Sequence, residues 1–280
     1  GGSQVAKAGG CRPLNRGFES HPPLTKMLLD AFKKRLKGFV GDKGIETAVV
    51  AYSGGIDSLV LSVVLKDAVK EFLCVFVKTP YISRWSLNNA VEKAKKYRLK
   101  FEVINVNEVV ENSEHRCYLC KRKFFELMDH IRRAREYDAI FDGTNYDDLS
   151  EDRPGLKAKE EFKVVSPLAD LKLGKKMILK IAEELKMDIP PKETCLLMRF
   201  EPGRNVSVRD LNTVEELEEF LRQYVNGALR VRVYGNMAVI ETEDGLENVL
   251  REKEEIVKMF ENCGFRKVCL NLKSYRSSFY

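Results

Sequence analysis

The stretch Ser53–Ser58, which reads S-G-G-I-D-S, lies between an apolar run at residues 48–52 and a second apolar run at residues 59–65. This order predicts a buried strand, a tight glycine turn and the start of a helix. The two glycines let the backbone turn without a Cβ in the way, and a helix start presents unpaired N–H groups and the positive end of the helix dipole. The stretch is therefore predicted to bind an anion.

The residue types in this turn predict which anion it binds. Its spacing matches neither the Walker loop nor the dinucleotide motif G-x-G-x-x-G. A carboxylate beside a phosphate site requires a cation between the two, and Mg²⁺ is the cation expected at Asp57. Clusters of Ser, Gly and Asp also form ordinary turns, but the strand before this one and the helix after it favour nucleotide binding. The predicted nucleotide-binding residues of the turn are Ser53, Gly54, Gly55, Asp57 and Ser58.

The composition is that of a globular protein without a membrane span. The chain has 280 residues, of which 44% are hydrophobic, and this is enough for two packed domains. No apolar run approaches the roughly 20 residues that cross a bilayer, and no stretch resembles a secretory signal. The net charge of +6 comes from interspersed acids and bases, so it neither requires nor excludes a nucleic-acid partner. We expect a cytoplasmic protein.

The pattern of apolar residues predicts a tail followed by an α/β domain. Residues 1–23 have the composition of a disordered tail, and residues 10–22 resemble a translated tRNA gene, so we expect the native start near Met27. Residues 24–205 alternate strands with helices, which predicts a parallel sheet with helices on both faces and a ligand at the carboxyl ends of the strands. The expected strands are residues 47–52, 72–77, 100–105 and 139–141, and the expected helices are residues 24–39, 57–69, 84–97, 121–135 and 174–186.

A small α+β domain is expected over residues 206–280. Two strand patterns in it are separated by Gly235 and Asn236, which is a hairpin signal. We expect its helices to pack on one face of an antiparallel sheet. The expected order is a helix at residues 213–224, strands at 229–234 and 237–242, a helix at 246–262 and a strand at 267–272.

Three of the seven cysteines form a candidate site. Cys117 and Cys120 make a C-x-x-C motif at the expected entrance of a helix, and Cys195 follows much later in the chain. The helix entrance and the neighbouring bases Arg116 and Lys121 should lower the pKa of the two helix thiols, which would make them better ligands and nucleophiles. Seven cysteines in a cytoplasmic chain favour metal, cluster or catalytic use over a disulfide framework.

The residues alone leave three interpretations open for these thiols. A [4Fe-4S] cluster held by Cys117, Cys120 and Cys195 is preferred, because three thiolates leave one iron without a protein ligand and able to carry sulfide. A sulfur-relay thiol is the second interpretation. A structural zinc ion is the third, because zinc requires a fourth ligand and no histidine has a convincing spacing, although His115 is close.

Other polar residues extend the candidate site. Asp142 and Asn145 follow an expected strand and could order Mg²⁺ or ribose, because loops at strand ends often carry functional residues, although Asp-Gly-Thr-Asn is also a good turn. Gly143, between them, is a further candidate for cofactor binding. Lys121 and Arg153 are candidates to neutralise phosphate charge at this site, with solvated surface bases as the alternative.

Arg230 and Arg232 alternate with apolar residues in a strand pattern, so both arginines lie on one face of the expected strand. A pair of arginines suits a phosphate monoester, and an exposed sheet face is the alternative. They are the predicted site for a substrate phosphate.

Short motifs along the chain resemble the LarE family. In order they are SGGIDS at residues 53–58, RCYLCK at 116–121, DGTNYDD at 142–148, DRPG at 152–155, SPL at 166–168, TCLLMRFEPG at 194–203, RVRVYG at 230–235 and LNLKSYRS at 270–277. The resemblance extends over residues 27–280 and implies the fold of PP-loop ATP pyrophosphatases. The departures are Glu193-Thr194 before Cys195 and Leu197-Met198 before Arg199, where that family usually has small residues.

The resemblance implies a sulfur transferase. In that family ATP adenylates the carboxylate of a pyridinium-carboxylate mononucleotide, and sulfide or another sulfur donor displaces AMP to form a thiocarboxylate of the nickel-pincer cofactor. Some members sacrifice the sulfur of the cysteine that matches Cys195, and others bind a [4Fe-4S] cluster through three cysteines, all of which this chain has. The expected cofactors are ATP, Mg²⁺ and the cluster, and the expected catalytic residues are Cys195, Lys121, Asp57 and Arg153.

Two other functions are left open. Related PP-loop enzymes that thiolate tRNA also combine this loop with three cysteines around a cluster, but the sequence lacks paired zinc knuckles and an evident aromatic RNA platform. A non-catalytic nucleotide-binding iron–sulfur sensor is the other alternative. We expect the small mononucleotide as partner, with no membrane and no nucleic acid, and the pattern is compatible with a homo-oligomer.

Overall fold

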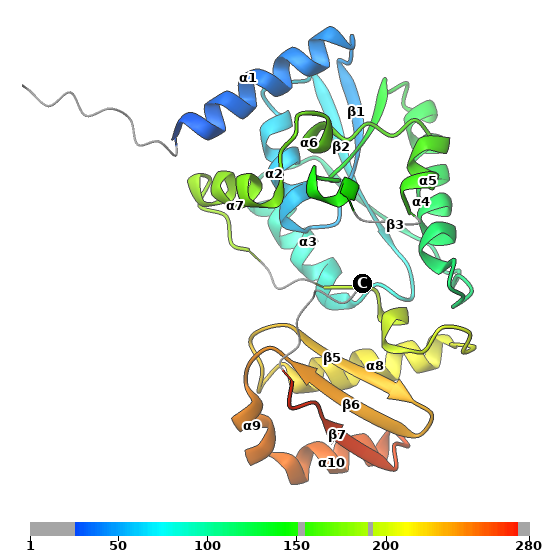
Figure 1. Ribbon diagram of the computed structural model, residues 1–280. Helices are drawn as coiled ribbons and strands as arrows, with labels where there is room; N and C mark the ends of the chain where they lie inside the picture. The colour runs from blue at the N-terminus through cyan, green and yellow to red at the C-terminus, as the bar shows by residue number, and fades with distance from the viewer. Residues whose placement is uncertain (1–25, 151–154, 190–192, 274–280) are drawn as a thin grey trace, which may run out of the picture.

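The computed structural model describes residues 26–150, 155–189 and 193–273. The expected tail at residues 1–23 and the candidate residue Arg153 lie outside these ranges, as does part of the last resemblance motif. Within the described residues the chain forms a larger α/β region with a smaller α+β region below it (Figure 1).

The larger region is built on a four-stranded parallel sheet in the order β3-β2-β1-β4. This confirms the predicted α/β fold. Its strands are β1 (Thr47–Ala51), β2 (Glu71–Lys78), β3 (Phe101–Asn105) and β4 (Ala139–Asp142). Its helices are α1 (Lys26–Asp42), α2 (Ile56–Leu65), α3 (Arg84–Lys96), α4 (Arg116–Ala134), α5 (Gly155–Glu161), α6 (Pro167–Asp170) and α7 (Lys175–Glu184), and η1 (Asp147–Ser150) is a short 3₁₀ turn.

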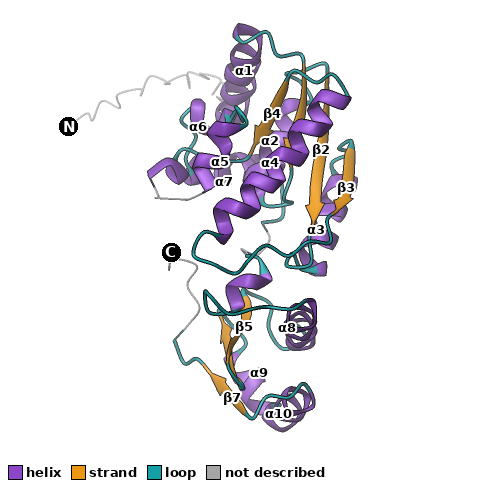
Figure 2. Ribbon diagram, turned by 90° about the vertical axis from the view of Figure 1, so that its right-hand side faces the viewer, coloured by secondary structure: helices purple, strands orange, loops and turns teal. Residues whose placement is uncertain are grey.

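Helices cover both faces of this sheet. Adjacent side chains along a strand point to opposite faces, so the apolar runs of these strands place apolar side chains on both faces, and both must be buried. On one face Val50 and Cys74 pack with Leu61 of α2 and Ile178 of α7 in one core. On the other face the neighbouring residues Val49 and Val75 pack with helices α4 and α5 in a second core. The layered arrangement is visible from the side in Figure 2. Burial on both faces explains why these strands read as continuous apolar runs.

The smaller region differs from the expected antiparallel domain. Strands β5 (Leu229–Tyr234) and β6 (Met237–Thr242) form the expected hairpin, but β7 (Lys267–Leu270) pairs parallel to β6, so the sheet is mixed. The reason is the long connection through α9 (Leu246–Arg251) and α10 (Lys253–Asn262), which returns the chain to the end at which β6 began. Helix α8 (Val208–Leu221) precedes the sheet, and the turn η2 (Leu196–Arg199) precedes that helix.

The hydrophobic core of the small sheet recruits residues from the rest of the chain. Leu196, Leu197 and Phe200 pack into it, as do Tyr81 and Val110 from the larger region. The segment around Cys195 is therefore held between the two regions. In the described part of the chain, no helix has both the length and the apolar character needed to cross a lipid bilayer.

Candidate functional site

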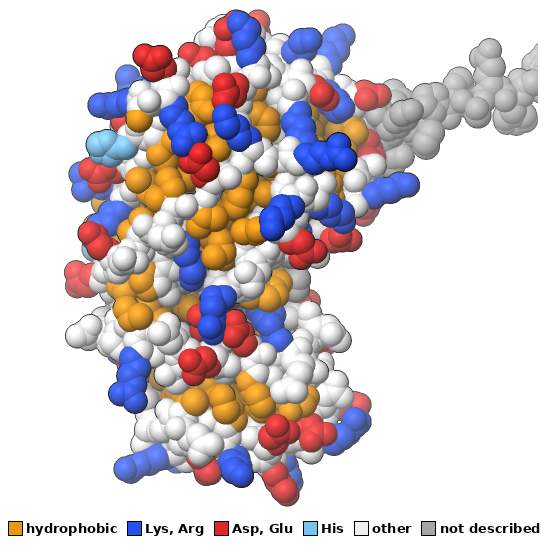
Figure 3. Space-filling model, turned by 180° about the vertical axis from the view of Figure 1, so that it is seen from behind, with side chains coloured by type: hydrophobic (Ala, Val, Ile, Leu, Met, Phe, Trp, Pro, Cys, Tyr) orange, Lys and Arg blue, Asp and Glu red, His pale blue; other side chains and the backbone are white. Residues whose placement is uncertain are grey.

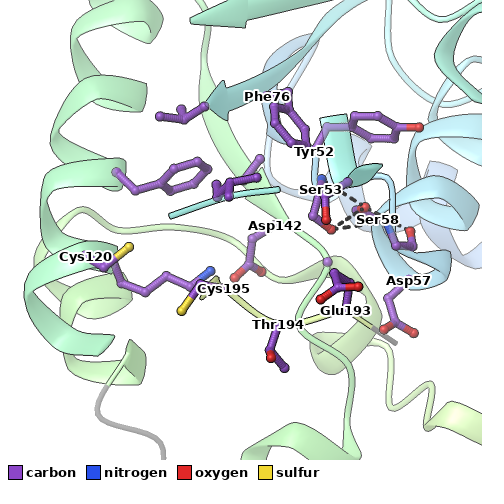
Figure 4. Close-up of a pocket in the computed structure, with 18 of the residues that line it drawn as sticks. Tyr52, Ser53, Asp57, Ser58, Phe76, Cys120, Asp142, Glu193, Thr194 and Cys195 are labelled. Carbon is purple, nitrogen blue, oxygen red and sulfur yellow. Dashed lines mark hydrogen bonds between the residues drawn. The ribbon is translucent and has the colours of Figure 1, made fainter. Parts of the chain in front are cut away.

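A cavity of about 420 Å³ opens at the carboxyl ends of β1, β2 and β4 (Figure 4). Six segments line it: the β1–α2 turn, the end of β2, the start of α3, the first turns of α4, the loop after β4, and the residues before η2. In Figure 4, Ser53, Ser58 and Asp57 lie on one side, Cys120 and Cys195 lie on the other, and Asp142 lies between them. We call Ser53–Ser58 the phosphate wall, and we call Cys120 with Cys195 the thiol wall.

The phosphate wall has the predicted strand–turn–helix geometry. Gly54 has a φ of +73°, and a Cβ at this position would lie 2.7 Å from Cβ of Ala90, so only glycine fits. The hydroxyl groups of Ser53 and Ser58 form a hydrogen bond with 3.2 Å between their oxygens, and the Gly55 N–H donates to Ser53 Oγ at 3.3 Å. Because α2 begins at Ile56 directly after this turn, its first N–H groups face the cavity end of the sheet.

Asp57 is paired with a lysine that the sequence analysis did not single out. Lys175 Nζ lies 2.8 and 2.9 Å from the two carboxylate oxygens of Asp57. Lys175 is the first residue of α7, and its N–H donates to Asp147 Oδ2 at 2.7 Å, which orients the helix start. The signal in the sequence was a glycine and two lysines, residues 174–176, at the expected start of that helix. The ammonium group therefore adds a positive charge beside the phosphate wall.

The loop after β4 packs directly on the phosphate wall. A Cβ at Gly143 would lie 2.8 Å from the backbone nitrogen of Ser58, so the loop approaches α2 as closely as glycine allows. Gly143 lines the cavity as expected, together with Asp142. Asn145 does not line it: this side chain is buried, and its Oδ1 accepts from the N–H groups of Asp147 and Asp148 at 2.9 and 3.2 Å. The structure thus places Asn145 as the capping residue of a turn.

The thiol wall brings together Cys120 of α4 and Cys195 from the segment before η2. Tyr81 connects the two segments: its hydroxyl lies 3.4 Å from Cys120 Sγ, and its carbonyl accepts from the Leu196 N–H at 2.7 Å. Tyr81 is buried in the core of the small sheet. The two thiols therefore share one cavity although they are far apart in the sequence.

The prediction that the helix-entrance thiols are acidic is wrong for Cys120. Burial raises the pKa of Cys120, and this outweighs the lowering effects of Tyr81 and Lys121. Burial also raises the pKa of Cys195 to about 11, with a further contribution from the nearby charge of Cys120. The expectation failed because the Cys120 thiol is desolvated: α4 begins at Arg116, so Cys117 lies exposed in its first turn, whereas Cys120 lies one turn further along and faces the cavity.

The third cysteine differs from the other two in its exposure. Cys117 is exposed one turn before Cys120 and does not line the cavity. Across the described residues, no three His, Cys, Asp or Glu side chains are arranged to hold a metal ion. The donor chemistry of three thiols fits an iron–sulfur cluster, whereas their positions in this structure do not form a ligand set. Binding of a cluster would require Cys117 to turn toward Cys120 and Cys195.

A buried guanidinium group holds the Cys195 segment in place. Arg199 is 1% exposed, binds Glu218 of α8 through two hydrogen bonds of 2.8 and 2.9 Å, and binds Glu193 at 2.5 Å. It also donates to the carbonyl oxygens of Thr194 and Cys195 at 3.0 and 3.3 Å. Glu193, a departure from the LarE pattern, is therefore one of the two carboxylates that hold Arg199, and it also binds Arg222 at 3.0 Å.

The remaining candidates are divided between the cavity and the small domain. Lys121 lines the cavity, with its ammonium group 5.5 Å from the ring centre of Phe124. Arg230 is buried in β5, and Arg232 binds Glu241 at 2.8 Å; neither of these arginines lines the cavity. The structure therefore keeps the predicted substrate-phosphate pair separate from the phosphate wall.

Comparison with known proteins identifies the relatives of this chain. A family model described as NAD synthase matches residues 28–140. The uncharacterized protein MJ0830 of Methanocaldococcus jannaschii is 60% identical over 229 residues, which are 82% of this chain and 90% of that protein. Protein slr1717 of Synechocystis sp., also uncharacterized, is 30% identical over 261 residues, which are 89% of this chain and 97% of that protein. The pyridinium-3,5-bisthiocarboxylic acid mononucleotide synthase of Lactiplantibacillus plantarum is 26% identical over 246 residues, covering 84% and 89%. The chain therefore belongs to the family of MJ0830 and slr1717; its residues 28–140 resemble NAD synthase, and its similarity to the bisthiocarboxylic acid mononucleotide synthase is distant.

Proposed function

We propose that this protein is an ATP-dependent sulfur transferase that converts a carboxylate of a pyridinium-carboxylate mononucleotide into a thiocarboxylate. The observation that carries the proposal is the single cavity that contains both the phosphate wall and the thiol wall. The distant relative named for the synthesis of a bisthiocarboxylic acid mononucleotide supports the choice of substrate. A pair of thiols that faces a nucleotide-activating loop supports a sulfur-transfer step after activation.

The phosphate wall would perform the first half of the reaction. Its hydroxyl and N–H donors would hold the β- and γ-phosphates, and Lys175 would neutralise part of their charge. Asp57 is the residue that would hold Mg²⁺, which lowers the charge on the phosphates when bound. A substrate carboxylate oxygen forms a bond to the α-phosphorus while the bond between the α-phosphorus and the bridging oxygen breaks. The products of this step are an acyl-adenylate and pyrophosphate.

The thiol wall would perform the second half. A sulfur nucleophile attacks the acyl carbon, and AMP leaves with the electron pair of the broken C–O bond. Lys121 lies at the cavity surface beside Cys120, where its positive charge favours anionic sulfur. Burial keeps the thiols of Cys120 and Cys195 protonated at neutral pH, so attack requires loss of a proton in the cavity or delivery of sulfur from another donor.

The cluster interpretation remains part of the proposal. Cys117, Cys120 and Cys195 would be the ligands of a [4Fe-4S] cluster, which supplies an open iron able to carry sulfide when bound. Anaerobic iron and sulfide analysis should then find about four irons per chain, and Cys117→Ala, Cys120→Ala and Cys195→Ala should each lose them. Cys263→Ala, in the small domain, is the matched control. Iron that persists in all three variants would exclude this ligand set.

The central test is a single-turnover reaction under anaerobic conditions. Wild-type protein, ATP, the pyridinium-carboxylate mononucleotide and sulfide should yield pyrophosphate, AMP and a thiocarboxylate in equal amounts, measured by chromatography and mass spectrometry. Cys195→Ala should lose the thiocarboxylate but keep pyrophosphate release, and Cys263→Ala should keep both.

Two outcomes of that experiment would redirect the proposal. Pyrophosphate release that requires tRNA, together with tRNA retention in filter binding, would identify tRNA thiolation instead. On the face shown in Figure 3, basic and acidic side chains are interspersed, which does not favour RNA as the substrate. ATP binding without pyrophosphate release for any acceptor would identify a nucleotide sensor.

A further inference from the structure

A chain of four polar side chains runs from α5 to the cavity. Lys159 Nζ donates to Ser166 Oγ at 2.7 Å, and Ser166 Oγ donates to Asp142 Oδ1 at 2.5 Å. Thr144 Oγ1 donates to Asp142 Oδ2 at 2.6 Å, and the Thr144 N–H donates to Oδ1 at 3.2 Å. Ser166 and Asp142 are 3% and 6% exposed, so water has little access to the middle of the chain.

The direction of each hydrogen bond in this chain is fixed by its ends. An ammonium group can only donate, and a carboxylate can only accept. The Ser166 hydroxyl therefore accepts from Lys159 and donates to Asp142, and the Thr144 hydroxyl must give its proton to Asp142. Low local polarity strengthens such a charged chain and makes a reversal costly.

At its cavity end, this series of hydrogen-bonded side chains consequently presents hydrogen-bond acceptors. Asp142 and Thr144 both line the cavity. Asp142 Oδ1 already accepts two hydrogen bonds, whereas Oδ2 accepts one from Thr144. Oδ2 and the Thr144 oxygen thus keep lone pairs for a donor in the cavity. A phosphate oxygen, which is itself an acceptor, is repelled here.

The position of this acceptor pair selects the donor. Gly143, between the two residues, packs against the Ser58 nitrogen at the start of α2, so the acceptors lie next to the donors of the phosphate wall. The group next to the phosphates in ATP is the ribose, and its hydroxyls are its donors. We propose that Asp142 and Thr144 bind a ribose hydroxyl of ATP, and that Ser166 and Lys159 are positioning residues that orient them.

The proposal rests only on the nucleotide half of the proposed function, and direct binding tests it. Dissociation constants of ATP, 2′-deoxyATP and 3′-deoxyATP are measured by calorimetry without any acceptor, with and without Mg²⁺. Wild-type protein should bind ATP roughly tenfold more tightly than the analogue that lacks the recognised hydroxyl, which also identifies that hydroxyl. Failure of sulfur transfer in other assays would leave this result unchanged.

Variants of the chain should reduce the discrimination. Thr144→Val should reduce the preference for ATP over the deficient analogue several-fold, because only Asp142 then accepts from the hydroxyl, while Thr144→Ser keeps the preference. Lys159→Met should reduce the preference several-fold, and Lys159→Arg should restore it, because arginine also donates to Ser166. A purely structural defect would weaken the binding of ATP and of the analogue by the same factor.

Three results would overturn the proposal. The first is wild-type protein that binds both deoxy analogues as tightly as ATP, which needs no variant. The second is Thr144→Val with unchanged discrimination. The third is Thr144→Val that loses only the Mg²⁺ dependence of binding, because the acceptors would then bind hydrated Mg²⁺ rather than ribose.

Discussion

The phosphate wall is built from six consecutive residues, whereas the thiol wall is built from two segments that meet only in the folded chain. Ser53–Ser58 make hydrogen bonds with one another and lead directly into α2. Cys120 and Cys195 are brought together through Tyr81 and through Arg199, which itself depends on α8 of the small domain. One part of this site, the phosphate wall, is thus determined by a single short motif, whereas the other part, the thiol wall, depends on the packing of distant segments.

The largest effect is expected from a substitution that disrupts only the phosphate wall. Asp57→Asn removes the carboxylate that would hold Mg²⁺ and leaves Lys175 without its paired charge. Pyrophosphate release should fall at least roughly 1,000-fold, measured with a coupled phosphate assay. The alkylation rate of Cys195 should not change, because the thiol wall is held by other segments. Asp67→Asn, an exposed aspartate paired with Lys33, is the control and should keep full activity. Release at the wild-type rate in Asp57→Asn would contradict the role of this carboxylate.

The second-largest effect is expected from a substitution that disrupts only the thiol wall. Arg199→Met removes the cation that Glu193 and Glu218 share; Glu193 keeps Arg222 at 3.0 Å, whereas the buried carboxylate of Glu218 loses its paired charge. Unfolding by urea should show a loss of about 3–5 kcal/mol, together with faster alkylation of Cys195. Lys100→Met, which breaks an exposed pair with Glu71, should leave the unfolding midpoint in place. Equal stability of the two variants would mean that the network around Arg199 does not support this wall.

A third measurement sharpens the electrostatic difference between the walls. Because burial raises the pKa of Cys195 to about 11, its thiol is protonated at neutral pH, and its alkylation rate should rise tenfold with each pH unit up to that value. At pH 8 its thiolate fraction should be roughly 100-fold below that of an ordinary thiol. Peptide mapping after iodoacetamide treatment compares it with the exposed Cys117 in the same sample. A Cys195 that reacts as fast as Cys117 at pH 8 would show that the segment opens in solution.

The smallest expected effect separates backbone conformation from close packing in the phosphate wall. Gly54 and Gly203 both have positive φ values, +73° and +85°, but only Gly54 has atoms within reach of an added Cβ. Gly203→Ala should cost about 1 kcal/mol in the free energy of unfolding. Gly54→Ala should cost about 2 kcal/mol more, because Ala90 must move, and it should also weaken ATP binding. Similar costs for both substitutions would remove the packing argument for this glycine.

The sequence predicted the larger domain well, because its signals are local and repeated. The four parallel strands lie within one or two residues of the expected ranges, since apolar runs bounded by turns define them. Less of the small domain was predictable. The parallel pairing of β7 depends on how α9 and α10 return the chain. Helix α8 begins at Val208, earlier than expected, because Ser207 and Asp210 form a capping box there.

The candidate site shows the same division between local and distant information. Lys175 was missed because nothing near it in the sequence refers to Asp57, which lies 118 residues away. Asn145 was expected at the nucleotide, but its oxygen is occupied by the two N–H groups of the following turn. Cys120 was expected to be acidic from its neighbours, but desolvation in the folded protein outweighs those neighbours.

By itself, the sequence determined the anion-binding turn, because two glycines between a buried strand and a helix allow few other conformations and carry their own donors. Only the tertiary structure decided that two thiols face that turn, that their protons are held tightly, and that a small domain braces one of them through Arg199. The physical reason is that a hydrogen-bonded turn is a property of neighbouring residues, whereas burial and the meeting of distant segments are properties of the packed chain.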